Sequence, residues 1–148
     1  MIQNKIKMGS PEEKELMRKL KWNNGSFAHI QRGSYDINGR EMYFRSKWEA
    51  NTCLYLDWLK KQGEIIDWEY EPKPFDFPTR TNNRYVPDFI VTTKKGLECW
   101  EVKGYYTKKD KTKMKRFAQY YPEYKIIMVE KEFYNDIKKK VGKMLRFF

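Results

Sequence analysis

The chain has 148 residues, of which 40% are hydrophobic and 17% aromatic, and its formal net charge is +11. Two cysteines and one histidine exclude a four-ligand zinc site and paired-histidine nuclease chemistry, and no apolar run is long enough to span a membrane. The positive charge favours a polyanionic partner, nucleic acid before an anionic membrane surface, and without a signal-peptide core we expect a cytoplasmic protein.

The first predicted element is a helix over residues 10–22, which a serine caps and an Asn-Asn-Gly sequence ends. A stretch rich in Gly, Ser and Asn follows over residues 23–39, with a short hairpin expected near residues 35–43. Basic residues are frequent here. We therefore expect residues 1–43 to form a basic arm that lies on the surface, contacts DNA or forms a dimer. The length of the rest, residues 44–148, suits one folded core.

The signals are clearer over residues 46–62, where we predict a second helix. Ser46 can cap its start and Gly63 can close its end. Its apolar stripe at helical spacing comprises Trp48, Thr52, Cys53, Leu56 and Leu59. Glu49 lies inside this stripe. A carboxylate among apolar neighbours needs a cation or a hydrogen-bond donor, so Glu49 is either a functional group or a rim residue that reaches solvent.

The segment over residues 65–77 is strand-like and rich in aromatic residues, but three prolines make its second half an edge or irregular strand. A polar turn over residues 79–84 leads to residues 85–104, which we predict to be two paired strands about a Lys-Lys-Gly turn. Val86 precedes a proline and is therefore extended, which puts Asp88 at the mouth of the first strand.

Side chains alternate between the two faces along the second strand of this pair. Glu101 and Lys103 therefore share one face, whereas Trp100 and Val102 share the other. With Asp88 on the neighbouring strand, two carboxylates and an ammonium group converge. This set of groups indicates metal-dependent chemistry.

A basic amphipathic helix is predicted from Lys108 and ends before Pro122. Its apolar face comprises Met114, Phe117, Ala118 and Tyr121. The apolar run over residues 126–129 predicts a strand buried on both faces of a parallel pair, reached by a crossover connection. A final helix over residues 132–146 would bury Phe133, Ile137, Val141 and Leu145 and expose Lys138, Lys139, Lys140 and Lys143. The order of elements indicates an α/β fold.

These candidate residues suit phosphodiester hydrolysis, which needs an activated water and stabilisation of the charge that builds on phosphorus and the leaving oxygen. Mg²⁺ held by a few carboxylates supports both. Asp88 and Glu101 can hold such an ion between adjacent strands, with the carbonyl group of Val102 as a further ligand. Glu49 could complete the site or bind a second ion through water. Lys103 could orient or deprotonate the water, or neutralise the phosphate. Each motif alone is weak, and the specificity lies in the combination.

The sequence Pro87-Asp88, followed by Glu101-Val102-Lys103, resembles the PD-(D/E)XK nuclease superfamily. The nearer resemblance is to the small phage endonuclease I type of Holliday-junction resolvase and to related phage and prophage nucleases. It rests on four segments: Phe44-Arg45-Ser46-Lys47-Trp48-Glu49, Trp68-Glu69-Tyr70-Glu71, Tyr85-Val86-Pro87-Asp88-Phe89 and Glu101-Val102-Lys103-Gly104.

The resemblance implies a restriction-endonuclease-like fold, in which a mixed β-sheet is flanked by helices, and a Mg²⁺-dependent DNA endonuclease in which Mn²⁺ can substitute. It implies that Glu49, Asp88, Glu101 and Lys103 form the active site and that Asp88, Glu101, Val102 and Glu49 hold the metal. It also implies a homodimer that acts on branched or duplex DNA, in the cytoplasm of a host cell if the protein is phage-encoded. The basic residues that we expect to contact DNA are Arg45, Lys108, Lys109, Lys111, Lys113 and Arg116.

Three alternatives stay open. One is a sequence-specific nicking or homing endonuclease on the same core, with residues 1–40 used for recognition. Another is a non-catalytic nucleic-acid-binding protein whose lysines and aromatic residues contact phosphates and bases. A membrane-surface protein is least favoured, because the apolar face of the C-terminal basic helix is needed for the core.

Overall fold

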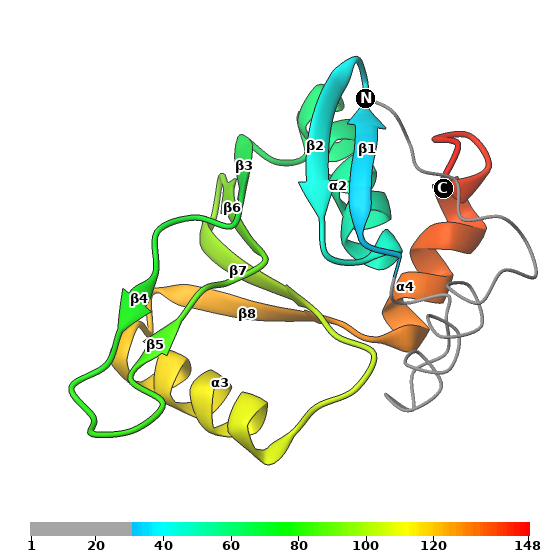
Figure 1. The fold of residues 1–148 in the computed structure, drawn as a ribbon. Coiled ribbons are helices and arrows are strands. Elements are labelled where there is room, and N and C mark those ends of the chain that lie inside the picture. Colours follow the sequence, from blue (N-terminus) through cyan, green and yellow to red (C-terminus); the bar gives the residue numbers. More distant parts are fainter. Residues whose placement is uncertain (1–30) are drawn as a thin grey trace, which may run out of the picture.

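The computed structural model describes residues 31–148 (Figure 1), so the predicted helix over residues 10–22 lies outside the described residues. The described part starts with a hairpin of two antiparallel strands, β1 (Gly33–Ile37) and β2 (Arg40–Phe44). This confirms the predicted hairpin. The division between an arm over residues 1–43 and a separate core stays a prediction, because most of that arm lies outside the described residues.

The tight turn of this hairpin follows from its two central residues. Asn38 and Gly39 have positive φ angles of 52° and 87°, and this residue pair is the one that two-residue hairpins favour for that reason. The last residue of each strand, Ile37 and Phe44, is buried in the core. The hairpin is thereby packed onto the rest of the described chain.

The helix predicted over residues 46–62 is confirmed as α2 (Lys47–Lys61). The side-chain oxygen of Ser46 accepts the N–H of Glu49 at 3.1 Å and caps its start, and Gly63, with a φ of +76°, follows its end. The predicted stripe is buried at Trp48, Thr52, Cys53 and Leu56 and half-buried at Leu59. Cys53 and Cys99 are both buried free thiols.

The main β-sheet has four strands in the spatial order β3-β6-β7-β8. They are β3 (Asp67–Tyr70), β6 (Phe89–Thr93), β7 (Gly96–Val102) and β8 (Tyr124–Val129). Strand β6 is antiparallel to both β3 and β7, whereas β7 and β8 are parallel, so the sheet is mixed. The β6–β7 pair is the strand pair predicted over residues 85–104.

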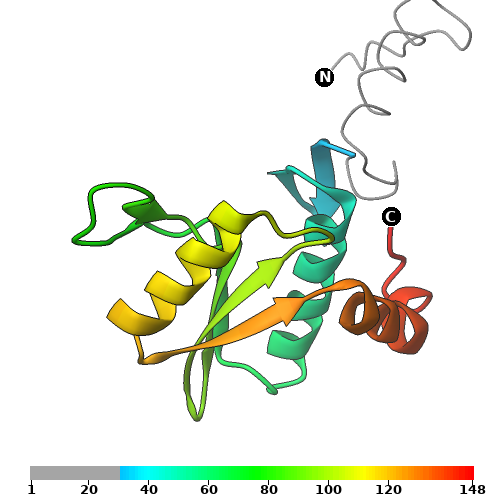
Figure 2. The same cartoon turned by 90° about the horizontal axis from the view of Figure 1, so that it is seen from below.

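Helices cover both faces of this sheet (Figures 1 and 2). One face carries α3 (Lys108–Tyr120), whose Phe117 packs near Cys99 of β7. The other face carries α2, which packs against Trp100 and Val102. The described chain is therefore an α/β unit with a mixed sheet between helices. The predicted apolar face of α3 is too wide, since Ala118 is exposed.

The segment over residues 65–77 divides as its prolines predict. Its first half supplies β3, and its second half supplies β4 (Phe75–Asp76), which pairs only with β5 (Arg84–Tyr85). Proline lacks the backbone donor that a sheet requires, so this ribbon stays separate from the main sheet. Figure 1 shows it projecting beside α3.

Strand β8 corrects the prediction of a strand buried on both faces. It lies at the edge of the sheet. Val129 is buried, but Ile126, Ile127 and Met128 are half-buried. An unbroken apolar run does not by itself distinguish a central strand from an edge strand that one helix partly covers.

The final helix predicted over residues 132–146 is wrong in its extent and in part of its buried face. Helix α4 (Lys131–Ile137) continues as a π-helix, η2 (Lys138–Gly142), which breaks the 3.6-residue spacing of the prediction. The buried side chains are Tyr134 and Ile137; Phe133 is exposed, and Val141 and Leu145 are half-buried. Within residues 31–148, no helix is long and apolar enough to cross a membrane.

Candidate active site

Asp88 lies at the end of the sheet, directly before β6. The chain reaches it through Pro87, which is fully buried, and Asp88 itself is only 5% exposed. Its Oδ2 atom accepts the N–H of Val102, at the end of β7, at 2.7 Å. Its carbonyl group accepts the N–H of Glu71 at 2.9 Å. The first bond fixes the carboxylate across the ends of β6 and β7, and the second ties the backbone of Asp88 to the residue that follows β3. Asp88 lies at the mouth of its strand, as predicted.

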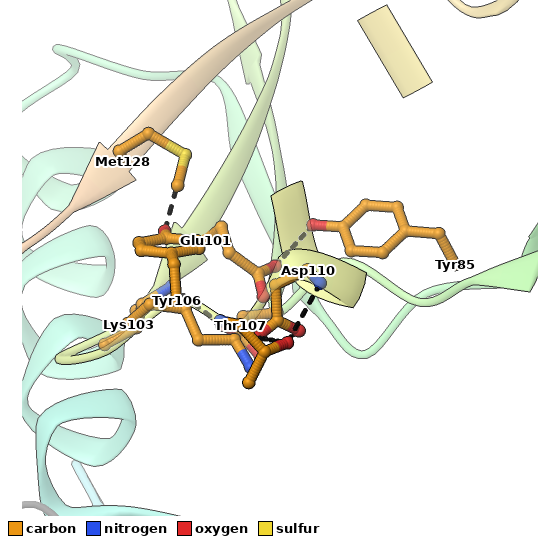
Figure 3. A network of polar contacts seen from close by, with 9 residues as sticks. Tyr85, Glu101, Lys103, Tyr106, Thr107, Asp110 and Met128 are labelled. Atoms are coloured by element: carbon orange, nitrogen blue, oxygen red, sulfur yellow. Dashed lines mark hydrogen bonds and ion pairs between the residues drawn. The ribbon is translucent and has the colours of Figure 1, made fainter. Parts of the chain in front are cut away.

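Glu101 lies on β7 and faces the side of the sheet that α3 covers, as the strand alternation predicts. The hydroxyl group of Tyr85 donates to its Oε2 atom (Figure 3) and lies 3.6 Å from the sulfur of Cys99. Glu101 is 6% exposed. A strand carboxylate is thus buried beside a phenol that positions it.

Glu49 reaches the same region from the first turn of α2. Its Oε2 atom accepts the N–H of Arg45 at 3.1 Å and the hydroxyl of Tyr70 at 2.9 Å. It is 7% exposed, so the alternative of a solvent-reaching rim residue is excluded. Because it satisfies a backbone donor just before α2, Glu49 also stabilises the start of that helix.

Burial raises the pKa of all three carboxyl groups. The pKa of Asp88 lies well above its ordinary value because of desolvation, with added repulsion from Glu101 and Glu49. For Glu101, desolvation outweighs the hydrogen bond from Tyr85 and the charge of Lys103, which lower its pKa. For Glu49, desolvation outweighs its two hydrogen bonds. The positive charges of Arg45 and Lys103 therefore compensate the three buried carboxyl groups only in part, a condition typical of functional sites.

The three carboxyl groups line one pocket of about 570 Å³. Five basic side chains line it as well: Arg32, Arg45, Arg84, Lys103 and Lys113. The acids are buried, at 5–7% exposure. The pocket therefore combines buried negative charge, which suits a cation, with arginine and lysine side chains, which suit phosphate oxygens.

Lys103 connects the pocket to α3 (Figure 3). It directly follows β7, and its Nζ atom lies 3.6 Å from Oδ1 of Asp110 in the first turn of α3. The other oxygen of Asp110 accepts the N–H of Thr107 at 3.0 Å, and the Thr107 hydroxyl accepts the N–H of Asp110 at 3.1 Å. This reciprocal pair is a capping box. The same aspartate thus holds the helix start and the lysine.

The carboxylate oxygens are partly occupied by protein donors. Within residues 31–148, no three Asp, Glu, His or Cys side chains gather closely enough to enclose a metal ion. Two carboxylates are nevertheless enough, because Mg²⁺ is usually held by one or two carboxylates and keeps several of its water ligands. The hydrogen bonds described above use one oxygen each of Asp88, Glu101 and Glu49. The donor set of Asp88 and Glu101 therefore fits a magnesium ion.

The residues predicted to contact DNA fall into three groups. Arg45 and Lys113 line the pocket, although Arg45 also forms an ion pair of 2.6 Å with Glu71. The exposed surface of α3 carries Lys108, Lys109 and Lys111. Arg116 donates instead to two backbone carbonyl groups of the loop between β4 and β5, and so ties that ribbon to α3. A DNA contact by each of these residues stays a prediction.

The sequence reasoning did not single out several residues that the structure places here. Tyr85 and Tyr70 hold carboxylates, and Asp110 pairs with Lys103. The Thr107-x-x-Asp110 pattern before a basic run is a capping-box signal that could have identified the aspartate. No sequence pattern marks the two tyrosines, because each meets its carboxylate only through the fold.

Comparison with curated proteins and with solved structures finds no match to this chain. Residues 33–136 do match a protein family. The match runs from the start of β1 into α4 and includes all four candidate catalytic residues. It stops before η2. The chain therefore belongs to the family described as protein of unknown function (DUF1064).

Proposed function

We propose that this chain is a magnesium-dependent DNA endonuclease that hydrolyses phosphodiester bonds, with branched DNA as its substrate. One observation carries the proposal. Three buried carboxylates and a lysine, drawn from α2, from the ends of β6 and β7, and from the residue after β7, line a single pocket that arginine and lysine residues also line. Phosphodiester hydrolysis needs this combination of charges.

Asp88 and Glu101 hold the magnesium ion in this proposal. The carbonyl group of Val102 is a further ligand, and Glu49 completes the site directly or through water. The bound ion supplies positive charge that stabilises the phosphate and makes a water molecule easier to deprotonate. The chain's own task is to keep the carboxylates in place, which the donors Tyr85 and the N–H of Val102 support.

Lys103 acts on the phosphate or on the attacking water. Its Nζ lies near the carboxylate of Asp110, and its charge acts on Glu101. An ammonium group there can neutralise a phosphate oxygen or orient water for attack. Arg45 and Lys113, at the same pocket, provide further phosphate contacts.

The strand arrangement supports a restriction-endonuclease-like fold. Strand β6, which follows Pro87-Asp88, is antiparallel to β7, which carries Glu101 of the Glu-x-Lys sequence. Strand β8 is parallel to β7. Helices lie on both faces. We further propose a phage-encoded homodimer, because a two-fold dimer presents two active sites to a two-fold branched substrate.

The test is to incubate the full chain with a four-way junction, plain duplex, single strands and supercoiled plasmid, with Mg²⁺, with Mn²⁺ and with EDTA. We expect metal-dependent cuts placed by the junction, whatever its sequence. Cutting at one sequence in plain duplex would instead identify a nicking or homing endonuclease. The absence of cutting on every substrate with either metal would refute the proposal.

A second candidate is a non-catalytic nucleic-acid-binding protein. One observation favours it: each of the three acids already accepts a hydrogen bond from the protein, and no three-ligand group forms within the described residues. Such a protein would bind DNA equally well in EDTA. The double variant D88N/E101Q would also bind DNA like the wild type, and the wild type itself would not cleave DNA.

A further inference from the structure

The C-terminal end of the chain gathers positive charge that the proposed active site does not use. Five basic residues and no acidic residue occur over residues 138–148. We call them the C-terminal basic surface: Lys138, Lys139, Lys140, Lys143 and Arg146. All five are exposed. Within residues 31–148, none of them forms an ion pair.

This surface is held in place although its charges repel one another. Lys138, Lys139 and Lys140 are consecutive in η2, and like charges this close repel one another. Asn51 of α2 binds one residue before the five cations and one residue after them. The side chain of Asn51 donates to the hydroxyl of Tyr134 at 2.8 Å and accepts the N–H of Phe148 at 2.8 Å. An array of cations that form no ion pair within residues 31–148 suits a partner with closely spaced negative charges.

The surface lies apart from α3. Figure 2 shows α3 on one side of the sheet, and α4 with η2 on the other side, beyond α2. The pocket receives residues from both sides, since Glu49 comes from α2 and Lys113 from α3. The two basic surfaces therefore lie on opposite sides of the sheet, and the pocket receives residues from both sides.

We propose that the C-terminal basic surface binds the phosphate backbone of a second duplex arm, while α3 binds the first. The inference rests on the proposed DNA substrate and extends it from one contact surface to two. Tyr134 and Ile137 of α4 are buried in the protein, whereas Phe133 and Met144 are exposed, so an anionic membrane is the alternative partner that the vesicle measurement below tests.

The test compares two double substitutions with the same change of charge. K139E/K140E alters the C-terminal basic surface. The matched control, K94E/K95E, alters two exposed lysines in the turn between β6 and β7, at the opposite end of the sheet from the pocket. Binding of the full chain to a four-way junction and to a short linear duplex is measured in EDTA over a range of salt concentrations.

We expect K139E/K140E to weaken junction binding about tenfold and to reduce the salt slope by about 2, while the control changes binding less than about threefold. The short duplex, which α3 can hold alone, should bind nearly as before. Equal losses in both variants, or no loss in K139E/K140E, would overturn the proposal. So would an equal loss on the short duplex, since both surfaces would then contact one arm.

Two further measurements keep the result decisive. If K139E/K140E unfolds at a lower temperature, K139Q/K140Q replaces it and must still weaken junction binding. Vesicles that contain phosphatidylserine test the membrane: a variant that loses vesicle binding and keeps junction binding would overturn the proposal. Because the assay has no metal and reads no cleavage, a failed nuclease assay leaves this result standing, and a negative result here leaves the nuclease proposal standing.

Discussion

Lys103 and Asp110 join the proposed active site to α3, with 3.6 Å between Nζ of the lysine and Oδ1 of the aspartate. Asp110 also belongs to the capping box that starts α3. The position of the lysine is therefore linked to the start of the helix on which most of the predicted DNA contacts lie. We expect Asp110 to act as a positioning residue for Lys103.

Asp110→Asn tests this role, because asparagine keeps an oxygen acceptor for the cap but loses the charge that faces Lys103. We expect single-turnover cleavage at saturating DNA to slow about tenfold, with little change in the dissociation constant for DNA. Asp110→Ala is the structural control. It also removes the acceptor for the Thr107 N–H, although Thr107 still accepts the N–H of residue 110, and should cost up to about 1 kcal/mol of unfolding free energy. Wild-type cleavage by Asp110→Asn would show that the aspartate only caps the helix.

The pKa of Asp88 predicts an unusual pH dependence of stability. Its folded pKa lies well above the ordinary value of 3.8, so the folded chain keeps a proton that the unfolded chain has released. The contribution of Asp88 to the free energy of unfolding therefore falls as pH rises from the unfolded pKa through the folded pKa, and is constant above it.

Asp88→Asn should remove the decrease in unfolding free energy that Asp88 causes as pH rises. Without metal at neutral pH, we expect the variant to be more stable than the wild type by about 1 kcal/mol or more, since its amide can still accept the N–H of Val102. Denaturant unfolding of both proteins at several pH values gives the difference that belongs to Asp88. The stability difference between the two proteins should grow with pH between acid and neutral conditions. A difference that stays constant would contradict a raised pKa of Asp88.

Tyr85→Phe tests the phenol that holds Glu101. The hydrogen bond from Tyr85 lowers the pKa of Glu101, so its loss raises that pKa further. Metal ligands must be deprotonated, so we expect the Mg²⁺ concentration for half-maximal cleavage to rise about tenfold at neutral pH. The deficit should shrink as pH increases.

Tyr70→Phe is the matched control for this change. It removes one of two donors to Glu49, which keeps the N–H of Arg45. Its effect on the Mg²⁺ requirement should therefore be smaller than that of Tyr85→Phe. Equal effects would mean that the tyrosines act only through packing.

The net charge of +11 predicts binding that depends strongly on salt. Each lysine that contacts a phosphate contributes about 1 to the slope of log affinity against log salt. We expect K108E/K111E, which changes two exposed lysines of α3, to weaken binding to every DNA substrate and to reduce that slope by about 2. K94E/K95E again serves as the control. A slope that stays flat in the wild type would mean that these basic surfaces do not contact DNA.

The central part of the fold could be predicted from local signals. Proline at residue 87, the turn before Gly96 and the alternation at Glu101 and Lys103 together determine the β6–β7 pair and the facing of its side chains. Ser46 and Gly63 bound α2 as expected. These features succeed because each depends on residues that are close in the sequence.

The predictions are wrong at features that depend on contacts between residues far apart in the sequence. Whether β8 is central or at an edge depends on whether another strand pairs with its free side. The apolar residues of β8 alone do not determine this. The π-helix η2 shifts the C-terminal residues off helical spacing, and Tyr134 is buried against Trp48 in place of Phe133. The same limit applies to the site. The sequence proposed its acids and its lysine, whereas Tyr85 and Tyr70 join it only in the folded chain.

The most direct test compares the wild type with Glu101→Gln and Lys103→Ala on a four-way junction, with cleavage mapped in Mg²⁺ and binding measured in EDTA. Both substituted residues line the pocket, and the glutamine can still accept the hydrogen bond from Tyr85. The account predicts that each variant binds the junction like the wild type and does not cut it. Wild-type cleavage by either variant would contradict the proposed active site.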